Sequence, residues 1–83
     1  MSAPRVTLEQ WRALVAVVDA GGFAHAAERL HKTQSTVSYA VRRLEESLGV
    51  TVFELEGRRA VLTGAGRVLY RRGQALLRES GRV

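Results

Sequence analysis

The sequence has no cysteine and no long run of apolar residues. Without cysteine the chain can form neither a disulfide framework nor a thiolate metal site, and the lack of cysteine suits a reducing compartment. No apolar stretch approaches the ~20 residues that a membrane-spanning helix needs. The first residues, MSAPRVTLEQ, contain no apolar signal region. We therefore expect a cytoplasmic protein that makes no membrane contact.

A catalytic or metal-binding pattern is missing as well. The two histidines, His25 and His31, have neither cysteines nor paired acidic residues at ligand spacing. The Ser, His and acidic residues match no catalytic motif. A chain of 83 residues makes one small domain with little room for a substrate pocket. We therefore expect no enzymatic activity, no metal and no cofactor.

Lysine is nearly absent, since Lys32 is the only one among 13 basic residues. The formal net charge is +5, and it is unevenly spread. Residues 58–83 hold seven arginines against one glutamate, a balance of +6, whereas residues 33–57 hold two arginines against four glutamates, a balance of −2. A genome that favours arginine codons would explain the arginines equally well, but not the net charge. The charge predicts an anionic partner, with nucleic acid ahead of an anionic membrane surface.

Two helices are predicted before the middle of the chain. Thr7 and Gln10 have the spacing of a capping box, and apolar residues follow at helical spacing. Gly21-Gly22 ends this first helix. A second, short helix is expected over residues 23–30, and nothing before it provides a good side-chain cap.

The third predicted helix follows a tight turn at His31-Lys32 and is capped by Thr33. Gly49 ends it in the left-handed conformation that helix C-termini favour. At 100° per residue its apolar side chains fall on one stripe, consisting of Val37, Val41, Leu44 and Leu48. The opposite face is polar. The two helices and the turn between them make a helix-turn-helix whose second helix exposes a polar start.

This arrangement suits DNA. A helix N-terminus offers free N–H groups and a positive dipole end to phosphate, and short polar side chains can meet base edges in the major groove. Two β-prone runs, 52–55 and 60–62, flank a hairpin tip at 56–59 that would act as a wing on the flanking backbone or minor groove. The predicted DNA-binding residues are Thr33, Gln34, Ser35, Thr36, Ser38, Tyr39, Arg42, Arg43, Arg58 and Arg59.

Other interpretations of these residues stay open. Arg42 and Arg43 lie beside Glu45 and Glu46 and could be only a solvated face with ion pairs one helical turn apart. Arg43 could pair with Glu46 or Glu28. Thr33, Gln34 and Ser35 could serve helix capping alone, and Ser38 could be a neutral filler.

Residues 20–66, AGGFAHAAERLHKTQSTVSYAVRRLEESLGVTVFELEGRRAVLTGAG, resemble the N-terminal DNA-binding domain of LysR-type transcriptional regulators. The similarity covers about residues 7–72. Its markers are Phe23 with Ala26-Ala27, Gln34, Val37, Ser38, the RRLE of 42–45, Leu48-Gly49, Phe53, and Leu62-Thr63-x-Ala65-Gly66. The resemblance implies a mainly α-helical winged helix-turn-helix with a small β-hairpin, over residues 1–62. A long linker helix over 63–83 would follow.

The resemblance also implies partners. Members of this family bind a partly palindromic promoter site in double-stranded DNA as homodimers, and they regulate transcription in response to a small molecule. That effector binds a C-terminal domain that this chain does not contain, so the effector is expected only for a full-length protein. The sequence departs from the family at Gly22 and Ala24, which replace serines, and at Ser35 and Tyr39 on the polar helix face. Leu55 stands where the family usually has an arginine, so one phosphate contact is in doubt.

The last predicted helix starts after its cap, Thr63. One face carries Leu69, Gly73, Leu76, Ser80 and Val83. This face could pack on its own domain or against the same helix of a second copy. Since a helix rises 1.5 Å per residue, it should overhang so small a domain, which favours the homodimer.

Two functions of other classes compete with DNA binding. A winged helix used for protein–protein contact would need an apolar patch on the exposed face of the third helix, where this sequence has Ser, Thr, Tyr and Arg. A binder of anionic membranes would need a bulky apolar face on the arginine-rich last helix, which is missing. We rank the protein–protein module second.

Overall fold

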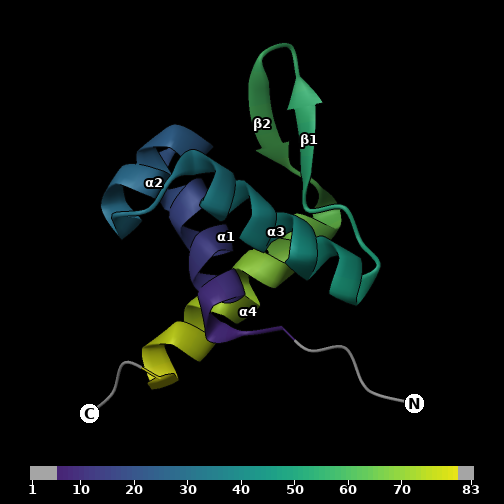
Figure 1. Ribbon diagram of the computed structural model, residues 1–83. Coiled ribbons are helices and arrows are strands. Elements are labelled where there is room, and N and C mark those ends of the chain that lie inside the picture. The colour runs from purple at the N-terminus through teal and green to yellow at the C-terminus, as the bar shows by residue number, and fades with distance from the viewer. Residues whose placement is uncertain (1–5, 81–83) are drawn as a thin grey trace.

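The computed structural model describes residues 6–80 and contains four helices and one hairpin within that range (Figure 1). Their order is α1 (Leu8–Ala20), α2 (Phe23–Leu30), α3 (Gln34–Leu48), β1 (Phe53–Glu56), β2 (Arg59–Leu62) and α4 (Gly64–Ser80). The strands form one antiparallel pair. The predicted fold class, mainly α with a small β-hairpin, is confirmed. Over the same range, no helix combines the length and apolar character needed to cross a membrane.

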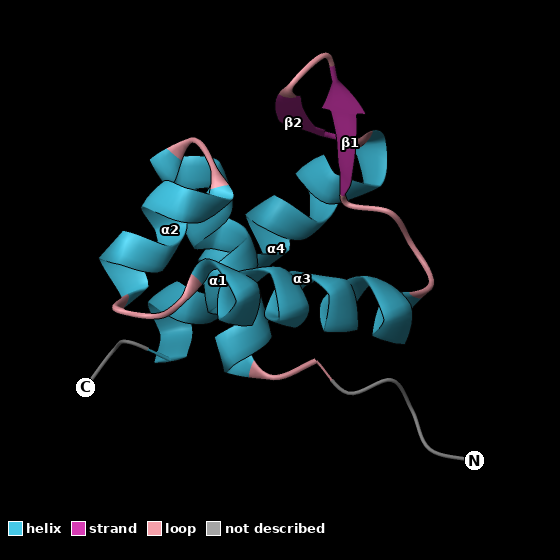
Figure 2. Ribbon diagram, turned by 45° about the horizontal axis from the view of Figure 1, so that its top comes forward, coloured by secondary structure: helices cyan, strands magenta, loops and turns pink. Residues whose placement is uncertain are grey.

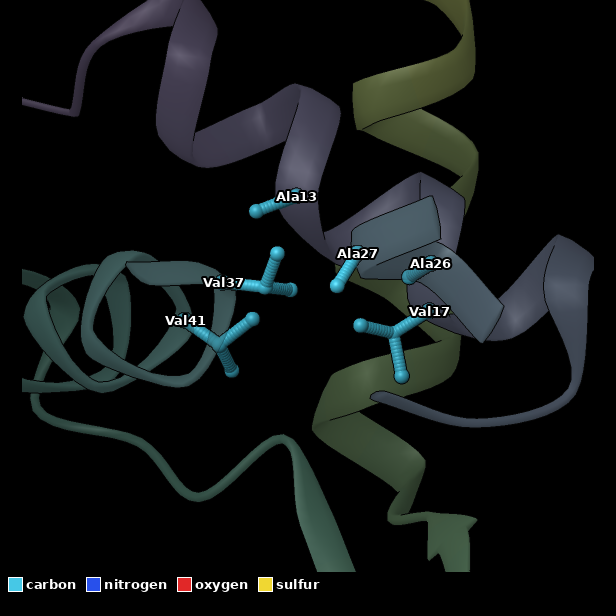
Figure 3. Packing of buried hydrophobic residues seen from close by; sticks show 6 residues of the cluster. All are labelled: Ala13, Val17, Ala26, Ala27, Val37 and Val41. Atoms are coloured by element: carbon cyan, nitrogen blue, oxygen red, sulfur yellow. The ribbon is translucent and has the colours of Figure 1, made fainter. Parts of the chain in front are cut away.

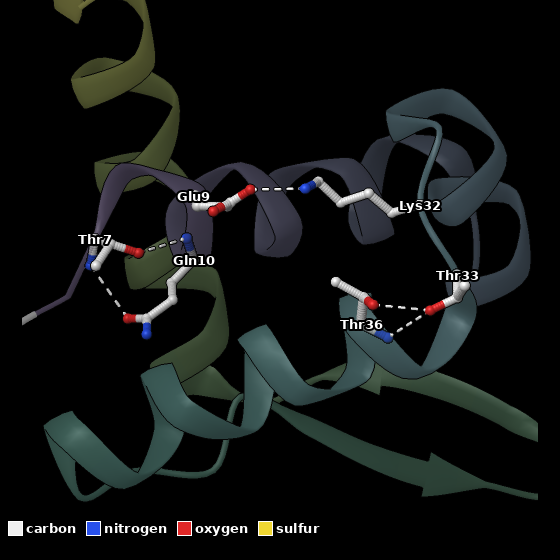
Figure 4. Close-up of polar contacts among 6 residues, drawn as sticks. All are labelled: Thr7, Glu9, Gln10, Lys32, Thr33 and Thr36. Carbon is white, nitrogen blue, oxygen red and sulfur yellow. Dashed lines mark hydrogen bonds and ion pairs between the residues drawn. The ribbon is translucent and has the colours of Figure 1, made fainter.

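Local signals start and stop the helices as predicted. At the start of α1 the Gln10 N–H donates to Thr7 Oγ1 at 3.1 Å, and the Thr7 N–H donates to Gln10 Oε1 at 3.2 Å (Figure 4). Gly21 ends this helix with a φ of 83°. The start of α2, at Gly22, has no side-chain cap. These contacts lie within four residues of each other, which is why they could be predicted from the sequence.

The turn between α2 and α3 is short and strained. His31 takes the left-handed conformation with a φ of 56°, which is uncommon for a residue with a Cβ. The Lys32 N–H donates to the Ala27 carbonyl at 2.9 Å and closes the end of α2. Lys32 Nζ lies 2.8 Å from Glu9 Oε2 and so joins this turn to the start of α1 (Figure 4). The turn is thereby bonded to the end of α2 and to the start of α1, and α3 begins directly after it.

The core between α1, α2 and α3 is built from small apolar side chains. Ala26 and Ala27 let α2 approach its neighbours closely, and Val37 and Val41 of α3 complete the cluster with Ala13 and Val17 (Figure 3). A second cluster joins Trp11, Leu14, Leu44 and Val52. The predicted stripe of α3 therefore faces inward. Burial of this apolar surface orients the opposite, polar face of α3 toward solvent.

The hairpin stands away from the helices (Figure 2). Its turn is shorter than predicted, because Glu56 still belongs to β1 and pairs with Arg59, the first residue of β2. Only Gly57 and Arg58 remain at the tip, and Gly57 adopts a φ of 65°. Arg59 is therefore a strand residue, which corrects its predicted position. Arg58 is at the tip as expected.

The last helix, α4, packs across α1. Gly73 is buried, and a Cβ at this position would lie 3.0 Å from Val15 Cγ2 and 3.1 Å from Trp11 Cε3. Leu69 and Leu76 pack on the cluster around Trp11. The sequence favours a second copy as the partner of this helix face, whereas in the structure these three residues pack within the chain. Small Gly73 permits this, because it lets the helix backbone approach the Trp11 ring. The Ser80 side chain and Val83 lie outside the described residues.

Candidate nucleic-acid interface

The two faces of α3 have opposite environments. Leu44 is 0% exposed, whereas Tyr39 is 60% exposed. Five of the predicted DNA-binding residues line one open depression on the outer face, namely Gln34, Ser35, Ser38, Tyr39 and Arg42. The structure thus brings together five of the ten predicted DNA-binding residues, whereas Thr36 does not line this depression. All five are exposed except Ser38, which is half-buried.

At the start of α3, Thr33 and Thr36 are engaged with each other. Thr33 Oγ1 accepts from the Thr36 N–H at 3.1 Å and lies 2.8 Å from Thr36 Oγ1 (Figure 4). The first intrahelical bond runs from the Val37 N–H to the Thr33 carbonyl. The amides of Gln34 and Ser35 precede that bond, so they point out of the helix end and suit an anion. Thr33 is therefore mainly a cap that prepares this end of the helix.

The adjacent arginines of α3 differ in what they contact. Arg43 Nη1 lies 3.2 Å from Glu46 Oε1, so Arg43 takes part in a surface ion pair. Of the two acidic residues that the sequence offers to Arg43, the structure pairs it with Glu46, while Glu28 Oε1 lies 3.7 Å from His25 Nδ1. Arg42 is exposed on the outer face beside Tyr39. Of the two, Arg42 is the one available for a new anionic partner.

A contact that the sequence analysis missed ties α3 to the hairpin. The Val52 N–H donates to Glu45 Oε2 at 2.7 Å, and the Val52 carbonyl accepts from the Thr63 N–H at 2.9 Å. A Cβ on Gly66 would lie 2.3 Å from that carbonyl oxygen. The base of the hairpin is thus held by α3 on one side and by the start of α4 on the other. One signal was present, because an acidic residue in the last turn of a helix opposes the helix dipole unless it has a partner.

One face of the hairpin carries only apolar strand residues, and the other carries the charged ones together with Val61. In the strand register Phe53 pairs with Leu62 and Leu55 pairs with Ala60, whereas Glu54 pairs with Val61. Directly paired residues share one face of a hairpin, and neighbours along a strand alternate. Glu54 and Glu56 therefore lie on the opposite face from Leu55. Leu55 is 80% exposed, so little of its side chain is used within the domain.

Polar contacts also fasten α4 to α1. The Tyr70 hydroxyl donates to Asp19 Oδ1, and Gln74 Nε2 donates to the Tyr70 hydroxyl at 3.0 Å. The hydrogen bond to Asp19 raises the pKa of Tyr70 above its ordinary value. At the other end of α1, the hydrogen bond and charge of Lys32 lower the pKa of Glu9. Both contacts lie at the surface and help to orient helices that the apolar core already joins.

Comparison with known proteins identifies the domain. A family model described as "Bacterial regulatory helix-turn-helix protein, lysR family" matches residues 8–67. The chain is 42% identical over 71 residues to a protein named "Probable RuBisCO transcriptional regulator" from Cyanophora paradoxa. That match covers 86% of this chain but 22% of the relative. The matched proteins are regulators, not enzymes, as the sequence predicts.

Solved structures agree with this match. The crystal structure of a CbnR DNA-binding domain in complex with DNA superposes with a TM-score of 0.85 at 34% identity. The superposition covers 92% of this chain and 87% of the CbnR chain. An OxyR mutant of Corynebacterium glutamicum superposes with a TM-score of 0.91 at 31% identity. That superposition covers 96% of this chain and 26% of the OxyR chain. The chain therefore spans about a quarter of the longer proteins that it matches.

Proposed function

This chain belongs to the LysR family of bacterial regulatory helix-turn-helix proteins, and from that premise we propose that it binds double-stranded DNA in a sequence-specific way. The observation that carries the proposal is the division of α3 into a buried apolar stripe and an exposed polar face. A CbnR domain of the same fold is known in complex with DNA. The same polar face argues against a protein–protein module, which needs apolar surface there.

In the proposed complex α3 lies in the major groove. Gln34, Ser35, Ser38 and Tyr39 meet base edges, while the first-turn amides and Arg42 bind phosphate. The hairpin lies over the flanking backbone as a wing, with Arg58 at its tip. Arg43 contributes less, because its guanidinium is shared with Glu46. Base preference is expected to depend on Ser35 and Tyr39, the two residues of this face that differ from the usual family pattern.

We also propose that two copies bind together through α4. Since Leu69, Gly73 and Leu76 pack on α1, they set the position of the helix, and its outward side meets the second copy. Val68 is 63% exposed on that helix and is the apolar residue offered for this contact. A two-fold dimer would present two α3 helices to successive major grooves and so requires a partly palindromic site.

For the whole protein, the proposed role is regulation of transcription at a promoter in response to a small molecule bound by a C-terminal domain. Its proposed location is the cytoplasm, in association with the nucleoid. The support is the family match and the names of the matched relatives, which are transcriptional regulators.

The test is selection of genomic DNA fragments with the purified 83-residue chain, followed by footprinting of the best fragment at two salt concentrations. Protection of two half-sites about one helical turn or a multiple apart, with binding that weakens steeply in salt, is the expected result. Arg42→Ala should weaken binding more than Arg43→Ala, which serves as the matched control. No preferred fragment and no salt dependence would overturn the proposal.

A further inference from the structure

A groove of about 620 Å³ lies between the hairpin and the ends of α1, α2 and α3. Gly22 and Phe23 line it at the start of α2, and Gln34 lines it at the start of α3. All four residues of β2 line the other side, and from β1 only Phe53 and Leu55 do. In both ribbon views β2 is the strand on the α2 side of the hairpin (Figures 1 and 2). The groove therefore begins at the N-terminus of α3 and follows the inner side of the hairpin.

The groove is positively charged. Arg58 and Arg59 line it from the hairpin, and Arg67 lines it from the first turn of α4. No acidic side chain is among the residues that line it. In the strand register Glu54 and Glu56 lie on the hairpin face opposite Leu55, and Arg59, which pairs with Glu56, shares that face. Three arginines from two elements thus line the channel, and of these Arg58 and Arg67 have no acidic residue paired with them across the strands.

The floor of the groove is apolar. Phe23 and Phe53 meet edge to face, with ring centroids 5.5 Å apart, and this contact fixes the start of α2 beside the base of the hairpin. Leu55 projects further along the same side and is 80% exposed. An apolar floor with arginines along it suits a chain of sugars and phosphates better than a single small anion, because the sugars can cover Leu55 while the phosphates bind arginine.

We propose that this channel, the wing groove, binds one phosphodiester strand of DNA and that Arg67 is a phosphate-binding residue outside the helix-turn-helix and the hairpin. The inference rests on the proposed DNA-binding function and adds a contact from α4. It also bears on Leu55, which stands where an arginine was expected. Arg67 supplies positive charge to the same groove that Leu55 lines.

The test compares Arg67→Ala with Arg72→Ala in DNA binding at several salt concentrations. Both arginines are exposed on α4. Arg72 comes five residues after Arg67, which places its side chain about 140° further around the helix axis, away from the wing groove. Loss of one phosphate contact lowers the slope of log affinity against log salt by about 0.9. The affinity of the unchanged chain divided by that of Arg67→Ala should therefore fall about 3.5-fold when the salt concentration is raised from 50 to 200 mM. Specific and non-specific DNA should be affected alike, and Arg72→Ala should keep the slope of the unchanged chain.

A second measurement locates the contact on the DNA. Single phosphates flanking the α3 site are replaced one at a time by neutral methylphosphonates. At one of these positions the replacement should weaken binding by the unchanged chain but not by Arg67→Ala, because the partner is already absent. If the chain binds DNA with salt dependence and Arg67→Ala matches Arg72→Ala in both measurements, the wing groove inference is wrong and the proposed function stands. If the unchanged chain binds no DNA, the proposed function itself is wrong.

Discussion

The helical body and the hairpin of this domain bury their side chains to opposite degrees. Nine of the ten buried core residues belong to α1, α2 and α3, and the tenth, Val52, precedes β1. Within the hairpin every residue from Glu54 to Ala60 is exposed. The helices are thus held together by apolar burial. The hairpin is held at its base, where Glu45, Thr63 and the close approach of Gly66 secure Val52.

This difference matters for binding. The packing of α3 fixes the face that it turns to DNA, so a change in the core should unfold the domain before it alters recognition. The position of the hairpin depends instead on a few contacts at its base, around Val52 and between Phe53 and Phe23. A change at these contacts should shift the wing and its arginines, and it should lower the free energy of unfolding less than a change in the core does. Four predictions test this distinction, and a fifth concerns a surface ion pair of the helical body.

The largest effect is expected for Leu44→Ala. Leu44 of α3 is fully buried in the cluster with Trp11, Leu14 and Val52, and truncation of a buried leucine costs about 3 kcal/mol of unfolding free energy. Leu55→Ala removes the same atoms from the hairpin and should cost less than about 0.5 kcal/mol, because Leu55 is exposed. Urea unfolding of both variants measures the difference. Equal losses would mean that the hairpin is as tightly packed as the helices.

Gly66→Ala should come next, with a loss of about 2 kcal/mol from overpacking. The added Cβ would lie 2.3 Å from the Val52 carbonyl oxygen and 2.9 Å from Leu62 Cδ2, so the base of the hairpin has to shift. Gly64→Ala is the matched control, since nothing lies within 4 Å of its Cβ position and alanine favours a helix. A Gly66→Ala variant as stable as Gly64→Ala would contradict the close approach at Val52.

A smaller effect, about 1.5 kcal/mol, is expected for Glu45→Ala, which leaves the partly buried Val52 N–H without its carboxylate acceptor. Glu46→Ala removes a surface pair with Arg43 and should cost less. In DNA binding, Glu45→Ala should also reduce the contribution of Arg58, because the hairpin is less well positioned.

The coupling can be measured with a double-variant cycle. Arg58→Ala alone should weaken binding to all sequences alike and lower the salt slope by about one unit. Glu45→Ala should cost less affinity in the Arg58→Ala background than in the unchanged chain. If the two losses of affinity are strictly additive, Glu45 affects the stability of the domain and not the contact made by Arg58.

The smallest effect concerns pH. Lys32 lowers the pKa of Glu9 below its ordinary value of 4.5. The ion pair therefore contributes stability that is present above pH 4.5 and is lost as the pH falls through the lowered pKa of the folded state. Thermal unfolding of Glu9→Gln should depend less on pH below 4.5 than that of the unchanged chain. Lys32→Met should likewise make the unfolding temperature less dependent on pH below 4.5. The double variant Glu9→Gln with Lys32→Met should reduce that dependence no further. A Lys32→Met profile like that of the unchanged chain would place the cause elsewhere.

Most of the fold could be predicted from the sequence because its determinants are local. The caps at Thr7, Thr33 and Thr63 act within three residues, and the stripe on α3 follows from helical periodicity alone. That stripe also determined which side chains would be exposed together on the opposite face. The candidate DNA-binding face of α3 was therefore already present in the sequence.

Only the tertiary structure decided how the elements meet. Sequence periodicity made one face of α4 apolar, but whether Leu69 and Leu76 meet α1 or a second copy depends on the fit of Gly73 under Trp11. The partner of Glu45 lies seven residues away, beyond the end of its helix. The wing groove joins Gln34 to Arg67 across the fold. Contacts of this kind depend on the relative positions of whole elements, which local propensities do not specify.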